Sequence, residues 1–157
     1  MTATRSSTTR AIAAWEATMT SHAIWMRIFG EQDVWEGLSP REYDVLYTLA
    51  KNARSATTTG PMRLNDLSRS VLLSQPALSR MVERLVTRGL VSRCADPADA
   101  RASHLSLTPQ GEALQRSVGK SHGTAVAQAM SGALSDDEIA TLEALHLKLI
   151  THAQEEK

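Results

Sequence analysis

Apolar and aromatic residues recur at helical spacing near the start of the chain, where they form a single stripe. The stripe consists of Ile12, Trp15, Met19, His22, Met26 and Phe29. Residues three and four apart lie on one face of a helix, so the pattern predicts an amphipathic helix over residues 8–29. Gly30 follows directly and indicates where this helix ends.

The second predicted helix begins with a capping box. Ser39 is placed to cap the helix, Pro40 suits its first position, and Glu42 completes the box. We expect this helix to run to about Asn52. Its apolar side is made by Tyr43, Leu46, Tyr47 and Leu49. Residues 55–61, with the sequence SATTTGP, have the composition of a loop.

Two shorter helices with only a few residues between them are predicted next. The first begins at Leu64 and runs to about Val71. Ser74 is expected to cap the second, where Pro76 is tolerated because the first turn lacks internal partners for its N–H groups. Gly89 indicates the end of this helix. Its apolar face is made by Leu78, Met81, Val82, Leu85 and Val86. A short helix, a tight connection and a second helix form a helix-turn-helix.

The pattern then changes from the period of a helix to that of a strand. Residues 90–94 and 103–107 are typical of strands, and the turn-rich residues 96–102 between them predict a hairpin, or wing. A long helix is expected over residues 109–130, and a last helix begins after Ser135. The predicted fold class is mainly α with a small β-hairpin wing: a winged helix-turn-helix domain plus a helical region.

The charges of the chain are unevenly distributed, although the formal net charge of its 157 residues is zero. Residues 63–108 carry seven Arg and no Lys, against four acidic residues. The planar fork of donors on Arg suits phosphates and guanine edges better than the point charge of Lys does. This excess favours a nucleic-acid partner for the middle of the chain, and an ordinary solvated surface is the alternative interpretation.

Other classes of function find little support in the sequence. It has no Gly-rich phosphate loop, nucleophile elbow or HExxH motif, so neither an enzyme nor a cofactor is expected. Its five His residues lack ligand spacing, so no metal site is expected. Neither a signal peptide nor an apolar run of the roughly 20 residues that span a bilayer is recognised, which favours a cytoplasmic protein without a membrane partner. The single cysteine, Cys94, is expected to be a small buried apolar residue on a strand.

The order of elements resembles that of the MarR (multiple antibiotic resistance regulator) family of winged helix-turn-helix transcriptional regulators. The most specific stretch is residues 74–111, SQPALSRMVERLVTRGLVSRCADPADARASHLSLTPQG. It looks like the family's recognition helix, followed by RGLV-R, an Asp-x-Arg wing and a strand ending in LTPQG. Residues 38–46, LSPREYDVL, resemble the family's second helix.

This resemblance implies both an architecture and a function. Residues 1–157 would form one domain of this type, with a winged helix-turn-helix over 38–108 and dimerisation helices over 8–30 and 109–155. The family implies a bacterial homodimer that binds a pseudo-palindromic operator in duplex DNA through successive major grooves. Repression is its usual mode, and a small, often aromatic or phenolic ligand commonly releases the DNA.

A recognition helix needs short polar side chains at its amino-terminal end, where base edges lie. Gln75 suits adenine, and Arg80 suits guanine or a phosphate. In the wing, the resemblance implies that Asp99 holds the loop through a salt bridge while Arg101 enters the minor groove, whose potential favours Arg. The expected DNA-binding residues are Ser74, Gln75, Ser79, Arg80, Arg84, Asp99 and Arg101. The alternative is that Ser74 only caps the helix and the Arg residues are solvated charges.

A ligand pocket is expected where the dimerisation helices meet the winged domain, again by resemblance. Aromatic walls and a few polar groups in these segments suit an amphipathic ligand. The expected lining residues are Trp15, His22, Met26, Arg27, Tyr43 and Tyr47. A Trp and Met stripe at helical spacing is also typical of a core or a dimer interface.

The alternative function is a winged-helix module that binds protein and not DNA. Such a module would present an apolar or acidic face on the helix of residues 74–88. The exposed positions expected there are Gln75, Ser79, Arg80, Glu83, Arg84 and Arg88. This polar and largely cationic set favours DNA.

Overall fold

The computed structural model describes residues 6–55, 62–71, 73–96 and 99–156; within these ranges, the side chains of residues 96 and 99–102 are outside the description. The chain divides into two compact units, Met1–Gly119 and Lys120–Lys157. The division falls inside the long helix α5, so each unit is described by itself.

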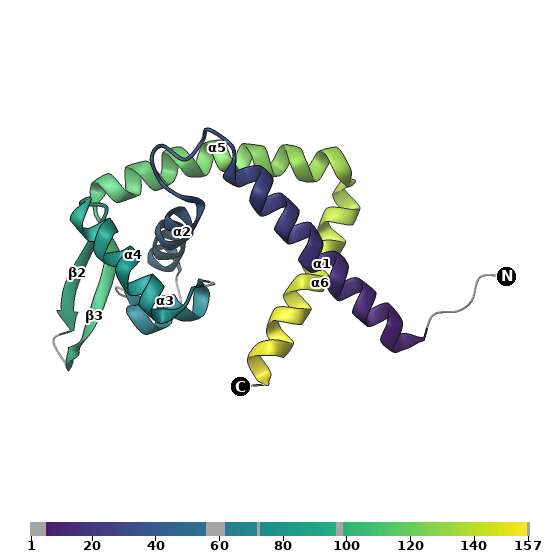
Figure 1. The fold of residues 1–157 in the computed structure, drawn as a ribbon, viewed down its shortest axis with the longest axis horizontal. Helices are drawn as coiled ribbons and strands as arrows, with labels where there is room; N and C mark the ends of the chain where they lie inside the picture. Colours follow the sequence, from purple (N-terminus) through teal and green to yellow (C-terminus); the bar gives the residue numbers. More distant parts are fainter. Residues whose placement is uncertain (1–5, 56–61, 72, 97–98, 157) are drawn as a thin grey trace. The chain divides into compact units, whose positions relative to one another are not determined.

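The helices that the sequence predicts are all present (Figure 1). In chain order the elements are α1 (Ser7–Gly30), α2 (Pro40–Arg54), β1 (Met62–Arg63), α3 (Leu64–Ser70), α4 (Gln75–Thr87), β2 (Val91–Asp96), β3 (Asp99–Leu107), α5 (Pro109–Ala133) and α6 (Asp136–Glu155). The mainly α fold with a small antiparallel sheet is therefore confirmed. The predicted loop over residues 55–61 lies outside the described residues except for Ser55.

The capping box of α2 is formed as predicted. The Glu42 backbone N–H donates to Ser39 Oγ at 3.3 Å, and the Ser39 backbone N–H donates to Glu42 Oε2 at 2.8 Å. Ser74 occupies the N-cap position of α4, but its side chain accepts no capping hydrogen bond. An N-cap oxygen accepts from the second or third helical N–H; Pro76 in the second position has none, and the N–H of Ala77 in the third position makes no such bond.

The wing differs from the predicted two-stranded hairpin. The sheet has three strands in the order β1-β3-β2, because Met62 and Arg63 pair antiparallel with Leu105 and His104 of β3. Strand pairing also extends into residues 96–102, which we expected to be a loop. Asp96 pairs with Asp99, and the register shifts between Ala95 and Asp96. Strands pair through backbone hydrogen bonds, which do not require apolar and polar side chains to alternate. The hydrophobic pattern of a sequence therefore predicts the end of a strand poorly.

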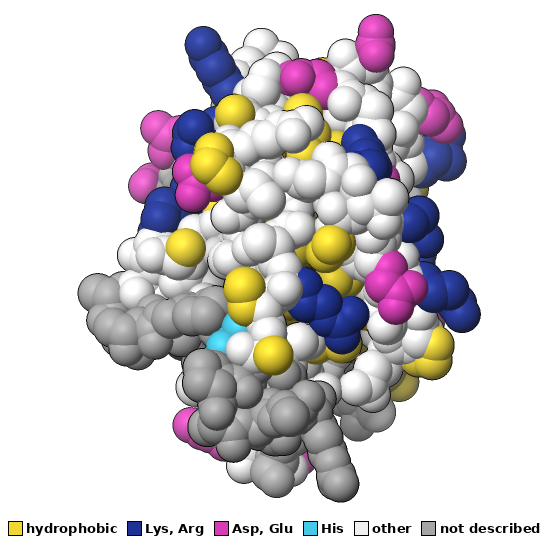
Figure 2. Space-filling view, turned by 90° about the vertical axis from the view of Figure 1, so that its left-hand side faces the viewer, with side chains coloured by type: hydrophobic (Ala, Val, Ile, Leu, Met, Phe, Trp, Pro, Cys, Tyr) yellow, Lys and Arg dark blue, Asp and Glu magenta, His cyan; other side chains and the backbone are white. Residues whose placement is uncertain are grey.

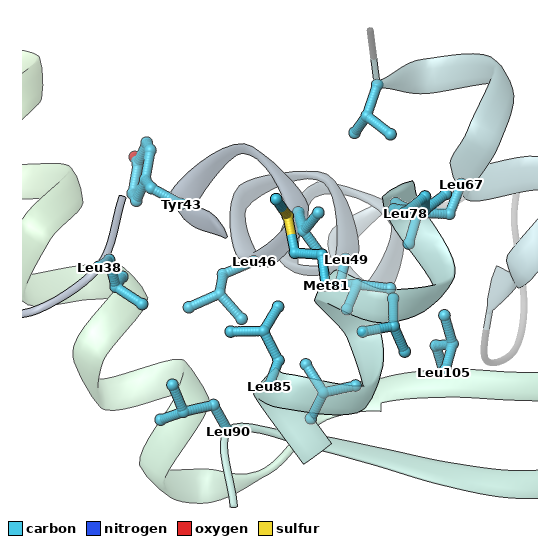
Figure 3. Packing of buried hydrophobic residues seen from close by; sticks show 14 of the residues in the cluster. Leu38, Tyr43, Leu46, Leu49, Leu67, Leu78, Met81, Leu85, Leu90 and Leu105 are labelled. Carbon is cyan, nitrogen blue, oxygen red and sulfur yellow. The ribbon is translucent and has the colours of Figure 1, made fainter. Parts of the chain in front are cut away.

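One apolar core joins α2, α3, α4 and the sheet (Figure 3). Its fully buried leucines come from every one of these elements and from the turn after α4. They are Leu46, Leu67, Leu78, Leu85, Leu90 and Leu105. Burying a leucine side chain fully is worth roughly 1.5–3 kcal/mol. This cluster therefore fixes the helix-turn-helix on α2 and on the base of the wing.

The first turn of α5 lies against the turn that leads into β2. A Cβ built on Gly111 would be 1.9 Å from the carbonyl oxygen of Leu90, so only glycine fits here. Thr108 strengthens the joint, because its Oγ1 donates to the carbonyl of Gly89 at 2.6 Å and accepts from the Gly111 N–H at 3.0 Å. Gly89 itself has φ +70°, a left-handed conformation that suits a helix C-terminus.

The helix α6, in the second unit, begins after Ser135 as predicted, and its first turn is held by a side-chain contact. Ser135 Oγ and the Ser135 backbone N–H both donate to Glu138 Oε2, at 2.8 and 2.9 Å. These bonds lower the pKa of the Glu138 carboxyl. Within the described part of the chain, α6 has no buried residue.

Candidate nucleic-acid interface

The helix α4 is strongly amphipathic, and the core orients it. Its buried residues are Leu78, Met81, Val82 and Leu85. The opposite side therefore faces solvent. Gln75, Arg80, Glu83 and Arg84 are exposed, whereas Ser79 is half-buried. The end of α4 that begins with Gln75 thus presents polar side chains outward, as recognition by a helix in the major groove requires.

The amino-terminal end of α4 is linked to α3 by a side-chain hydrogen bond. Gln75 Nε2 donates to Asn65 Oδ1 at 3.0 Å. Asn65 is the second residue of α3, and Ser68 Oγ donates to its backbone carbonyl at 2.7 Å. The sequence pattern indicated Gln75 as a candidate but gave no signal for Asn65. The two residues are ten apart in the chain and lie on different helices. Helical periodicity relates only residues of one helix, so it could not predict this contact.

The carboxyl-terminal end of α4 is held by a carboxylate of α2. Arg88 Nη1 lies 3.5 Å from Glu42 Oε1, and Arg88 Nη2 donates to the carbonyl of Gly37 at 3.1 Å. Arg84 Nε lies 3.9 Å from the same oxygen, and its Nη1 donates to the carbonyl of Arg80 at 3.4 Å. The Glu42 side chain is only 12% exposed, so this carboxylate is largely buried against the helix. Arg84, expected at the DNA, thus has a partner within the protein.

The wing is braced by polar contacts across its strands. The Ser92 and Ser106 hydroxyls are 2.7 Å apart, and Arg93 Nε donates to Ser103 Oγ at 3.0 Å. The expected wing residues Asp99 and Arg101 belong to β3, but their side chains lie outside the described residues.

Cationic side chains do not form one continuous patch on the face shown in Figure 2. Lys and Arg are spread over this face and alternate with acidic and apolar side chains. This arrangement agrees with a formal net charge of zero. On this face, attraction to a polyanion would depend on a few placed Arg residues more than on a broad field.

A cavity of about 790 Å³ lies between α1, α2 and the segment that includes α3. It brings together three residues expected to bind a ligand, His22, Met26 and Tyr47. Arg41 and Lys51 add cationic groups to its lining and Asp44 adds one carboxylate, beside apolar side chains such as Val71. A partly apolar lining with two cations against one carboxylate suits an amphipathic anion.

The other expected ligand residues do not line this cavity as far as the chain is described. Trp15 is 65% exposed on α1, and Arg27 lies 3.8 Å from Glu31 in an exposed ion pair. Tyr43 is buried and its ring packs against those of Trp35 and Tyr47, at centroid distances of 5.7 and 6.1 Å.

Burial raises the pKa of Tyr43, although a hydrogen bond with the side chain of Gln115 acts in the opposite direction. The phenol is thus held neutral inside the protein. Its hydroxyl also lies close to α5, since a Cβ on Gly119 would be 3.1 Å from it.

Among the residues that the structure describes, no group of three or more His, Cys, Asp or Glu is placed to hold a metal ion. No helix there has the length and apolar character needed to cross a membrane. Cys94 is exposed, so the expectation of a buried cysteine is wrong. Cys94 belongs to β2, and its side chain is on the face of the small sheet that points away from the core.

Comparisons with known proteins converge on one family. A MarR family model matches residues 36–102. The multiple antibiotic resistance protein MarR of Salmonella typhimurium is 32% identical over 113 residues, which cover 72% of this chain and 77% of that protein.

Solved structures share the fold. A MarR mutant from E. coli complexed with operator DNA has a TM-score of 0.73 at 24% identity, covering 92% of this chain and 99% of the other. BpsR of Bordetella bronchiseptica, whose DNA binding is regulated by 6-hydroxynicotinic acid, has a TM-score of 0.69 at 24% identity. That similarity covers 85% of this chain and 90% of BpsR.

Proposed function

Because this chain belongs to the MarR family of transcriptional regulators, we propose that it is a homodimeric repressor that binds a pseudo-palindromic operator and leaves it when a small anionic ligand binds. Proteins of this family are DNA-binding regulators and not enzymes. The observation that carries the proposal is the exposed, polar amino-terminal end of α4 on a helix whose opposite face is fixed in the core.

DNA contact is assigned to two regions of the fold. Gln75, Ser79 and Arg80 would reach base edges or phosphates in the major groove, with Ser74 and Arg84 beside the backbone. Asp99 and Arg101 of the wing would take the roles that the resemblance implies, with Arg101 in the minor groove. The polar face of α4 is also the reason to prefer DNA over a protein partner.

A dimer would cover apolar surface that is exposed in the single chain. Neither α1 nor α6 has a buried residue within the described chain. Both helices nevertheless expose large apolar side chains, among them Trp15 at 65% on α1 and Leu149 at 60% on α6. Isolated surface apolar residues are ordinary, but a row of them along a helix marks an interface.

The cavity between α1 and α2 is the proposed effector site. Its apolar lining would hold an aromatic ring, while Arg41 or Lys51 would face a carboxylate. The effector of BpsR, 6-hydroxynicotinic acid, is an aromatic acid of this kind. Isothermal titration with benzoate tests the site, and loss of the heat in Lys51→Met is the expected result. Equal heat for the wild type and this variant would remove Lys51 from the site.

The decisive experiment is selection of bound duplexes from a random pool. We expect a recovered pseudo-palindrome with half-sites about 10 bp apart, the spacing that a two-fold dimer on successive grooves requires. Light scattering on the same sample should give twice the chain mass of 17.1 kDa. A monomer without affinity for any duplex at low salt would contradict the proposal.

A further inference from the structure

The hydrogen bond between Asn65 and Gln75 joins the two helices of the helix-turn-helix at its exposed end. Gln75 Nε2 donates to Asn65 Oδ1 at 3.0 Å, and both residues are exposed. Two exposed amides gain little stability from such a bond, because water offers equivalent partners. The bond therefore calls for an explanation beyond stability.

The backbones on either side of this bond are fixed. Leu67 of α3 and Leu78 of α4 are both fully buried in the core (Figure 3). Asn65 is two residues before Leu67, and Gln75 is three residues before Leu78. The positions of both Cα atoms are thus set by packing, so the hydrogen bond fixes the orientation of the Gln75 amide.

The chemistry of this amide then determines what it can recognise. A Gln amide has two N–H donors and one carbonyl acceptor. Asn65 uses one donor, which leaves the second N–H and the carbonyl oxygen for a ligand. Adenine offers an N7 acceptor beside an N6 donor in the major groove, and this pair matches the remaining groups. Guanine offers two acceptors, N7 and O6. The fixed carbonyl oxygen of Gln75 would then face O6, and two acceptors form no hydrogen bond with each other.

We infer that Asn65 is a specificity-determining residue that holds the Gln75 amide in the orientation that selects adenine over guanine. Asn65 acts through Gln75 and is a positioning residue. The inference rests on the proposed DNA-binding function and adds to it a base preference and the residue that sets it. A free Gln75 side chain would have to be ordered on binding, and ordering a flexible side chain lowers affinity by about 2- to 10-fold.

The test compares base preferences at every position of the selected operator for the wild type and six variants. In Gln75→Ala, preference at one base pair of each half-site should fall by about 5- to 150-fold, the range of a bidentate contact. Asn65→Ala should lose preference at that same base pair by about 2- to 10-fold. The double variant should behave like Gln75→Ala alone.

Two further variants separate positioning from a structural role. Asn65→Asp retains the acceptor but adds a negative charge, so overall affinity should fall while the base preference is kept. Asn65→Ser, whose side chain is too short to reach Gln75, should repeat the effect of Asn65→Ala. Ser68→Ala is the matched control in α3, because its hydroxyl contacts only the Asn65 backbone among the contacts described.

The possible failures are distinguishable. If the wild type selects no site, the proposed function is wrong. If the wild type selects a site but Asn65→Ala keeps the full preference, or loses it at a different base pair from Gln75→Ala, the inference is wrong and the function stands. If Gln75→Ala shows the same base preferences as the wild type at every position, the inference is also wrong.

Discussion

Glu42 and Arg88, which are far apart in the sequence, are joined by an ion pair with 3.5 Å between Oε1 and Nη1. The other carboxylate oxygen of Glu42 accepts from the Ser39 backbone N–H. One partly buried side chain therefore both begins α2 and holds the last turn of α4. The orientation of α4 thus depends on a residue at the start of another helix.

Replacing Glu42 should separate these two roles. Gln is also accepted in a capping box, so Glu42→Gln should lower the free energy of unfolding by about 1 kcal/mol, through the ion pair alone. Glu42→Ala should cost about 1 kcal/mol more because the cap is lost as well. Urea unfolding followed by circular dichroism measures both. Glu83→Gln, which changes an exposed carboxylate of α4, is the control, and an effect of equal size there would contradict the assignment.

Two glycines of α5 should respond to alanine in opposite ways. Gly111→Ala would place a methyl group 1.9 Å from the Leu90 carbonyl oxygen, so the variant should unfold at clearly lower urea concentration or fail to fold. Gly123→Ala meets no atom of the described residues within 4 Å and should stabilise the helix by up to about 1 kcal/mol. A mild effect of the first substitution would mean that the close approach is relaxed in solution.

Arg80 should contribute to DNA binding as a single cation. In Arg80→Ala, the slope of log affinity against log salt concentration should become shallower by about one unit. Fluorescence anisotropy with the selected operator measures the slope. Arg116→Ala removes an exposed Arg of α5 that lies 3.3 Å from Glu112, and its slope should match that of the wild type. An unchanged slope for Arg80→Ala would remove this residue from the interface.

Tyr43 should make the protein less stable at alkaline pH. Burial raises the pKa of this phenol above its ordinary value of 10.0, so the unfolded chain loses the proton at lower pH than the native protein does. The stabilisation is complete below about pH 10 and is lost as the pH rises through the native pKa.

A pH series of urea unfolding tests this expectation. Tyr43→Phe should be less stable at neutral pH, because Gln115 loses its partner, but should show a shallower decline above about pH 10. Tyr47→Phe is the matched control, since the Tyr47 residue is 44% exposed. Parallel declines for the wild type and Tyr43→Phe would contradict the argument.

Periodicity and capping were enough to predict the helices. The stripe in α1, the Ser39–Glu42 box and the Gly89 stop are local signals, and each depends on residues within one or two turns. The strand β1 left no such signal, because Met62 and Arg63 are too few to show alternation. The resemblance supplied what periodicity could not, namely the expected role of α4 in binding DNA.

The candidate sites were predictable only in part, because they depend on which residues meet in three dimensions. His22 and Met26 are one turn apart on α1, so their shared face follows from sequence, but their meeting with Tyr47 across the cavity does not. Tyr43 and Tyr47 are also one turn apart, yet only Tyr43 is buried in the core. The partners of Gln75 and Arg88 come from other helices and were missed for the same reason.

The contact of Gly111 with Leu90 leaves no room for the hairpin to tilt independently of the first turn of α5. The strand β3 has nine residues, which at roughly 3.3 Å each extend about 30 Å. Used as a lever of that length, the strand converts each degree of rotation at its base into about 0.5 Å at its far end. A rotation of about 4° where α5 begins would therefore move the far end of β3 by about 2 Å.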